Sequence, residues 1–286
     1  MAARWAFGGR TLSLGQGVSA SDHAIGRIAG AAGLIAAALF SPAAALAGAW
    51  TVPQGTGLII ASLFGWTGVG APWGGNHGVK QNKVEGEAYV EYGLTDQLTI
   101  FGQTGLERYA LSPPTRNTYQ GLDYSDIGVR AKLWSTGGWV FSGEAAFFVP
   151  GAKNPSAPAQ VGNTGKAGEG RLLAGYGFSV AGMPGFLDVE GGYRIRTAGP
   201  PNEWHADFTV GLKPTPGLML MLQDFTTVST ASTNREFPAW RSSILQASVV
   251  VDLDSRWSLQ IAAFASVLAV KTNTERGAAL AIWRKF

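Results

Sequence analysis

The stretch Lys83–Tyr92, KVEGEAYVEY, decides the fold class. One set of alternate positions holds Lys83, Glu85, Glu87, Tyr89 and Glu91, and the other holds Val84, Gly86, Ala88, Val90 and Tyr92. Successive side chains of a β-strand point to opposite faces, so a strand places these charges on one face and leaves the other apolar. A helix would scatter the glutamates around its circumference. The stretch therefore predicts an amphipathic strand.

Similar segments recur along the chain, separated alternately by short turns and longer polar connections. The short turns contain Gly, Pro, Asp or Ser, which suit the reversal of a hairpin; they are residues 93–97, 135–138, 181–185, 214–217 and 252–256. The longer connections are 67–82, 110–124, 151–168, 197–202, 231–241 and 269–276. The predicted strands are 58–68, 83–92, 98–109, 125–134, 139–149, 169–180, 186–196, 203–213, 218–228, 243–252, 257–267 and 277–286.

This alternation predicts an all-β fold, a closed antiparallel transmembrane β-barrel of about 12 strands. Tilted strands of about 10 residues cross the hydrocarbon layer, and closure leaves no exposed edge. Such barrels have short turns on the periplasmic side and longer loops outside. An even number of strands then places both termini of the mature chain in the periplasm.

Residues 1–47 have the organisation of a secretory signal peptide. A polar, basic beginning precedes the apolar run Ile28–Phe40, and Ala45-Leu46-Ala47 supplies small residues at the cleavage positions. We expect this segment to be removed after Ala47, leaving the barrel at 48–286. The alternative is an N-terminal membrane anchor, because apolar character continues almost to Trp50. The long polar beginning also permits a later start codon, for example at Val18.

Composition excludes several classes of function. The chain has no cysteine, which removes disulfides and thiolate metal sites, and its three histidines show no metal-ligand spacing. The formal charge is +3, but Arg4, Arg10 and Arg27 precede residue 48, so the remainder is nearly neutral and has no basic stripe for nucleic acid. We expect no cofactor, no metal and no nucleic-acid partner.

Aromatic residues mark the ends of the predicted strands nearest the short turns or the C-terminus: Trp134, Trp139, Phe186, Trp257, Trp283 and Phe286. Aromatic rings gather at membrane–water interfaces, so we expect these six to form a periplasmic girdle. The alternative is a soluble lipocalin-like barrel or sandwich with its apolar faces inward. The many charged faces argue against it, because a small closed barrel fills its interior with apolar side chains.

The last residues, Ala278–Phe286 (AALAIWRKF), resemble the closing strand of bacterial outer-membrane β-barrel proteins of the porin-like or transporter-like kind. Leu280, Ile282 and Phe286 match the alternating apolar positions, whereas Arg284 stands where a second aromatic or apolar residue is usual. The resemblance implies the Gram-negative outer membrane as location, contact with its lipid, and Phe286 as a signal to the barrel assembly machinery. It identifies neither a subfamily nor a substrate.

The polar faces supply the candidate lumen and selectivity residues: Glu85, Glu87, Glu91, Glu107, Arg130, Lys132, Glu144, Arg171, Asp188, Glu190, Arg194, Arg196 and Asp207. Acids are richest on the second predicted strand and bases on the sixth and seventh, which lie far apart around a barrel wall. Opposed acidic and basic walls would orient a polar or zwitterionic solute. Alternatively, the charges pair into a buried network that blocks the lumen.

The functional hypothesis is a non-enzymatic outer-membrane channel for passive passage of small polar solutes. One alternative is a lipid-modifying hydrolase that uses His205 as general base, with Glu203 and Asp207 on the same face and Ser242 or Ser243 as nucleophile. Another is a closed barrel with a structural role or a role in polysaccharide export.

Overall fold

The computed structural model describes residues 48–70, 79–113, 116–154, 156–160, 163–234 and 237–286. The predicted signal peptide, 1–47, lies outside the described residues. The strands are β1 (Gly57–Val69), β2 (Lys80–Thr95), β3 (Leu98–Leu111), β4 (Asn117–Leu122), β5 (Ser125–Thr136), β6 (Trp139–Val149), β7 (Ala167–Val180), β8 (Met183–Arg196), β9 (Glu203–Thr215), β10 (Leu218–Ser229), β11 (Arg241–Asp252), β12 (Trp257–Val270) and β13 (Thr274–Lys285). Within the described ranges, no helix has the length and apolar character needed to cross a membrane.

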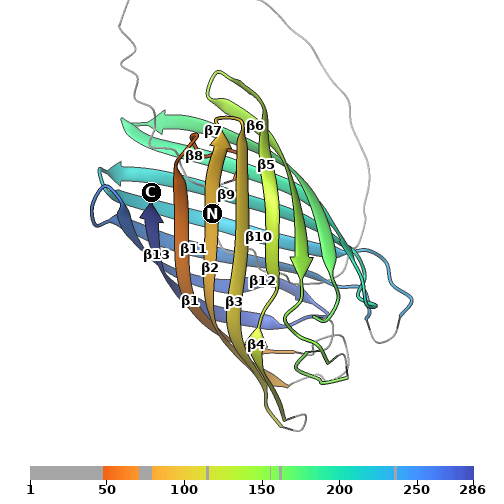
Figure 1. The fold of residues 1–286 in the computed structure, drawn as a ribbon. Helices are drawn as coiled ribbons and strands as arrows, with labels where there is room; N and C mark the ends of the chain where they lie inside the picture. Colours follow the sequence, from red (N-terminus) through yellow and green to blue (C-terminus); the bar gives the residue numbers. More distant parts are fainter. Residues whose placement is uncertain (1–47, 71–78, 114–115, 155, 161–162, 235–236) are drawn as a thin grey trace, which may run out of the picture.

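The strands form one closed antiparallel ring (Figure 1). Apart from β4 and β5, neighbours in the chain pair with one another, and β1 pairs with both β2 and β13. The β1–β13 register runs from Leu58 opposite Lys285 to Val69 opposite Thr274. Beyond it, Gly57 N donates to Phe286 O at 2.8 Å and Phe286 N donates to Gly57 O at 3.0 Å. The two ends of the sheet are thus joined, as a sheet in a bilayer requires.

β4 and β5 share one position in the ring. β4 pairs with the second half of β3, from Leu106 to Leu111, and β5 pairs with its first half, from Leu98 to Gln103. The ring therefore has 12 positions, as predicted. The assignment of all of 110–124 to a loop was wrong for β4. Polar Thr118 occupies an exposed position there, so the apolar alternation that marks the other strands is lost.

Charge lies inside the ring and apolar side chains lie outside. On β2, Glu85, Glu87 and Glu91 are buried, whereas Val84 is 55% exposed and Val90 43% exposed. A soluble barrel would bury the valines and expose the glutamates. The transmembrane orientation of the faces is therefore confirmed, since apolar side chains belong against lipid.

One end of the ring, here called the short-turn end, carries turns at residues 96–97, 137–138, 181–182, 216–217 and 253–256; the opposite end is the long-loop end. Most of these turns are shorter than predicted, because strands continue into residues assigned to the turns. Gly182 and Gly217 both adopt φ of 79°, in the left-handed region that favours glycine. The strands other than β4 exceed the predicted length of about 10 residues, because they extend past the segment that a tilted strand needs to cross the hydrocarbon layer.

The predicted aromatic girdle is partly correct. Four of its members are exposed at the short-turn end: Trp134, Trp139, Trp257 and Phe286. Phe186 and Trp283 were wrongly assigned, because they are 4% and 3% exposed and face the interior. Phe186 shares the inward face of β8 with Asp188, so side-chain alternation accounts for its direction.

Arg284, the departure from the usual closing strand, also lies on the outside at the short-turn end. Its guanidinium carbon is 5.4 Å from the centroid of the Trp257 ring, a cation–π distance. The charge therefore covers an aromatic ring in the girdle rather than entering the apolar band.

Candidate channel interior

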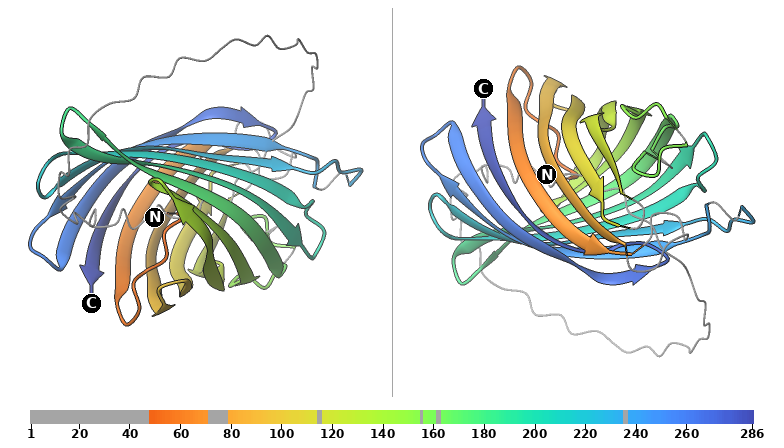
Figure 2. Two further views of the ribbon diagram at one scale, coloured as in Figure 1. Left: turned by 90° about the horizontal axis from the view of Figure 1, so that it is seen from above. Right: turned by 90° about the horizontal axis from the view of Figure 1, so that it is seen from below.

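Residues 48–56, here called the N-terminal segment, run inside the ring before β1 begins (Figure 2). Gln54 N donates to Asp96 Oδ1, in the β2–β3 turn, at 3.0 Å. Two residues earlier in the segment, Val52 N donates to Thr99 Oγ1 on β3 at 2.8 Å. The segment is therefore fastened to the inner wall at the short-turn end by its backbone.

The first residues of the segment reach three further strands. Ala49 N donates to Asp188 Oδ1 on β8 at 2.8 Å. Ser142 Oγ on β6 donates to Ala49 O at 2.5 Å, and Arg130 on β5 donates to Trp50 O at 3.1 Å. Because these partners and Thr99 lie on β3, β5, β6 and β8, the segment crosses the interior.

Trp50 completes an apolar layer at the short-turn end. Its ring meets that of Phe186 edge-on, with centroids 6.1 Å apart and an interplanar angle of 87°. Gly175 leaves room for it, since a Cβ at that position would lie 2.5 Å from the indole. The layer also includes Leu58, Ile60, Tyr89, Phe101, Met221, Val250, Ala281 and Trp283. These side chains form a buried apolar layer inside the ring at this end.

Arg130 joins three strands to the N-terminal segment. Its Nε lies 3.2 Å from Glu144 Oε2, and a terminal nitrogen lies 3.3 Å from Glu91 Oε2. The same terminal nitrogen donates to Trp50 O. Arg130 is 1% exposed, so these contacts replace water around a buried cation.

A larger ion-pair network spans β7, β8 and β9: Glu169, Arg171, Glu190, Arg194, Arg196, Glu203 and Asp207. Arg171 pairs with Glu169 and Asp207 and lies 3.0 Å from Glu190. Arg194 Nε lies 2.6 Å from Glu169 Oε2, so this carboxylate bridges two guanidinium groups. Each residue thus depends on partners from neighbouring strands, which fixes the side chains in place.

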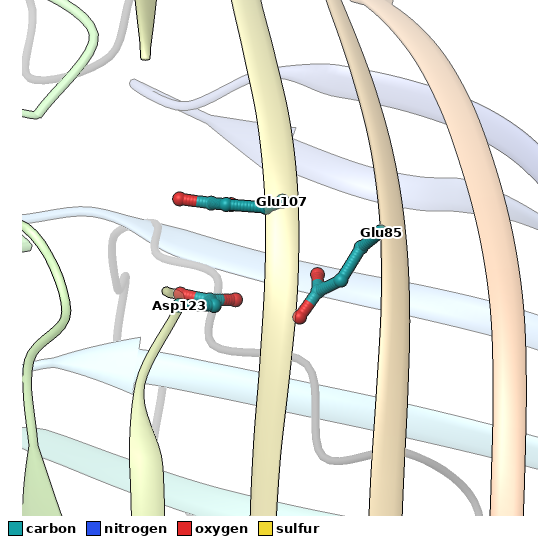
Figure 3. Close-up of side chains that lie close together, drawn as sticks. All are labelled: Glu85, Glu107 and Asp123. Atoms are coloured by element: carbon teal, nitrogen blue, oxygen red, sulfur yellow. The ribbon is translucent and has the colours of Figure 1, made fainter. Parts of the chain in front are cut away.

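Three carboxylates converge nearer the long-loop end, those of Glu85, Glu107 and Asp123 (Figure 3). Their spacing alone is suitable for a metal ion. Lys83 Nζ, however, lies 2.7 Å from Glu85, 2.8 Å from Glu107 and 2.9 Å from Asp123. The ammonium group takes the place that a metal ion would need, so the geometry is that of an ion-pair cluster.

The wall formed by β1 and β10–β13 carries mostly amides, hydroxyls and aromatic rings, and none of the predicted lumen residues lies on it. Gln223 Nε2 donates to Thr209 Oγ1 at 3.3 Å, and Gln246 Nε2 donates to Gln223 Oε1 at 3.0 Å. Phe64, Trp66, Phe225, Ile244 and Phe264 form an apolar cluster on the same wall. The inward alternation of each strand was the signal that would have located these residues.

The predicted lumen residues all lie on β2–β9, and those other than Lys132, Arg196 and Asp207 are buried. The bases of β7 and β8 pair with acids on β7–β9. Among the β2 acids, Glu91 pairs with Arg130, and Glu87 accepts a hydrogen bond from Gln103 at 2.7 Å. Local pairing, rather than a field between opposed walls, therefore organises the charges.

His205 is buried on β9 between two partners. Its Nε2 lies 3.3 Å from Glu203 Oε2, and its Nδ1 lies 3.3 Å from Thr227 Oγ1. Both ring nitrogens are thus engaged, and the ring is 5% exposed. These are the features of a hydrogen-bonded interior histidine.

The predicted nucleophiles do not meet this histidine. Ser243 Oγ donates to Asp224 Oδ2 at 2.5 Å. Ser242 Oγ is buried and has no hydrogen-bond partner in the part of the chain that the structure describes. The structure therefore brings neither serine into the contact with His205 that a triad requires.

The ring can be compared with solved structures. An outer-membrane channel from Pseudomonas putida F1 matches with a TM-score of 0.68 and 15% sequence identity, over 83% of this chain and 98% of that one. The chain has the outer-membrane β-barrel fold. The NanC porin matches this barrel with a TM-score of 0.49 and 7% identity, over 79% of this chain and 100% of that one. No protein-family model and no curated protein matches the sequence of the barrel.

Proposed function

We propose that the chain is an outer-membrane channel for the passive passage of small polar solutes, closed at its short-turn end by the N-terminal segment. The observation that carries the proposal is a transmembrane ring whose inner wall holds charged and hydrogen-bonding groups from β2 to β9. A channel for apolar solutes would not need so many buried charges on its inner wall, because buried charges are energetically costly.

The charge balance of the interior favours cations and cationic solutes. Lys83 faces three carboxylates, Arg130 faces two, and the network on β7, β8 and β9 has four carboxylates against three guanidinium groups. Rings and clusters of carboxylates select cations in pores, because their negative charge attracts cations and repels anions. We therefore expect the open channel to pass cations more readily than anions.

The short-turn end is proposed to face the periplasm, as in barrels with this asymmetry of loops. Both the N-terminal segment and Phe286 then lie on the side from which barrels are assembled. Phe286 is 49% exposed, while its backbone pairs with Gly57. Its ring is thus available to the assembly machinery while its backbone closes the ring.

The selectivity part of the proposal is tested by the zero-current potential across a planar bilayer with a KCl gradient. We expect a cation preference in the wild type and a smaller one in the double variant Glu85→Gln, Glu107→Gln. Val84→Thr, which alters the outer face of the same strand, is the matched control and should leave the potential unchanged. A preference for anions in the wild type would contradict the proposed role of the inner carboxylates.

A closed barrel with a structural role is the second candidate, and the burial of the interior ion pairs favours it: Arg130 is 1% exposed and Glu203 0%. Swelling of proteoliposomes in small sugars and amino acids separates the two functions. Solute entry supports the channel. An impermeable barrel, both complete and without residues 48–54, supports the structural role.

A further inference from the structure

The start of the N-terminal segment fits an acidic group on β8 with unusual closeness. A Cβ at residue 48 would lie 1.9 Å from Asp188 Oδ2, and Gly48 has φ of 67°. Only glycine avoids both the collision and the strain of this backbone conformation. Two covalent bonds and that contact place the nitrogen of Gly48 within about 5 Å of the carboxylate.

Asp188 is a buried carboxyl group beside the start of the N-terminal segment. It is 3% exposed, accepts a hydrogen bond from Ala49 N at 2.8 Å and shares a side-chain hydrogen bond with Glu190. In the described part of the chain, no Lys, Arg or His nitrogen lies within ion-pair distance of it. Glu190, the next inward residue of β8, brings a second carboxyl group beside Asp188 and lies 3.0 Å from Arg171, which leaves no cation paired directly with Asp188 in the described part of the chain. A buried carboxylate without a cation is costly.

The sequence indicates where a cation can come from. Ala45-Leu46-Ala47 has the small residues of a signal cleavage site, so removal of the leader makes Gly48 the first residue. A free α-amino group has a pKa of about 7.7–8.0 and is mostly protonated at neutral pH. Before cleavage the same nitrogen is an uncharged amide.

We propose that cleavage after Ala47 creates an α-ammonium group on Gly48 that forms an ion pair with Asp188. Processing of the leader thereby supplies the charge that fastens the N-terminal segment inside the barrel. The hydrogen bond from Ala49 N then fixes the second oxygen of the same carboxylate. This inference does not depend on the channel function, because a closed structural barrel would use the same ion pair.

The first test is the intact mass of the chain exported with its own leader. We expect a polypeptide that begins at Gly48. An exported chain that retains the leader, or that begins at another residue, would overturn the proposal.

The second test measures acetylation of the α-amino group at neutral pH by a succinimidyl ester, followed by mass analysis of the N-terminal peptide. Four folded chains are compared: one beginning at Gly48, one with a single alanine before Gly48, and each of these with Asp188→Asn. We expect the α-amine of the first chain to react at least about tenfold more slowly than in the other three, the scale of a charge-assisted hydrogen bond.

The alanine extension moves the ammonium group away from Asp188 without changing any barrel residue. The comparison of the two chains with Asp188 therefore stands even if Asp188→Asn does not fold. Equal reaction rates in these two chains would refute the ion pair. Because the assay reads an amine and not ion flow, its outcome is separate from that of the conductance experiments.

Discussion

Replacement of Arg130 by methionine tests whether ion pairs hold the interior together. The change removes a guanidinium group that is 1% exposed and takes this cation away from Glu91 and Glu144, and Trp50 O also loses this donor. Loss of one partner from a buried ion pair costs roughly 3–5 kcal/mol. Since two carboxylates lose the same cation, we expect Arg130→Met to lower the free energy of unfolding by an amount in the upper part of that range.

The assay is equilibrium unfolding in urea of the barrel refolded into lipid vesicles, followed by tryptophan fluorescence. Lys132→Met is the matched control, because Lys132 lies two residues away on β5 and has no ion pair among the described residues. Lys132→Met should change the free energy of unfolding by no more than about 0.5 kcal/mol, because it breaks none of the ion pairs of the described residues. Adding Glu91→Gln and Glu144→Gln to Arg130→Met should recover much of the loss. Equal costs for Arg130→Met and Lys132→Met would refute the reasoning.

Three further predictions concern the ends of the chain and one turn. Gly48→Ala should release the N-terminal segment from the wall, because the added methyl group collides with Asp188; we expect the bound position of the segment to lose more than about 1 kcal/mol of stability. Protease cleavage before β1 would report the release, and an uncleaved variant would contradict the steric argument. The pKa of Asp254 is held below its ordinary value by hydrogen bonds from the backbone N–H groups of residues 256 and 257. The ionised form therefore stabilises the turn above about pH 4, and this contribution is lost as the pH falls through the lowered pKa; an NMR titration with an ordinary midpoint would disprove it. Deletion of Phe286 should slow assembly in cells more than refolding in detergent, and equal effects would argue against a role in recognition.

The fold was predictable because the inside and outside of a transmembrane barrel differ at every second residue. The alternation from Lys83 to Tyr92 located β2 and gave the direction of each of its side chains correctly. The same rule would have placed Phe186 inside, since it shares its face with Asp188. The prediction that Phe186 belongs to the girdle was wrong because it rested on the position of this residue near a strand end and not on the alternation of side chains along the strand.

The N-terminal segment was not predictable from local pattern. It has no alternation and no regular strand pairing, and its contacts come from distant parts of the chain. Ala49 and Asp188 are 139 residues apart in the sequence. Such contacts depend on which strands meet across the closed ring, and no short stretch of sequence contains that information.

The pairing of the interior charges was predictable in kind but not in detail. Burial makes an unpaired charge costly, so a network was expected. Which acid meets Arg171 depends on the register between β7, β8 and β9, which places Arg171 opposite Gly192 and leaves space for its side chain to reach across. Sequence spacing within one strand does not determine that register.

Single-channel conductance tests the central claim most directly. A chain of residues 48–286 is compared in a planar bilayer at neutral pH with a chain that begins at Gly55 and therefore lacks the contacts of Ala49, Trp50 and Val52. We predict small or infrequent steps from the longer chain and larger, longer steps from the shortened one. Silence from both chains, once each is verified as a folded barrel, would contradict the account of a channel closed by its N-terminal segment.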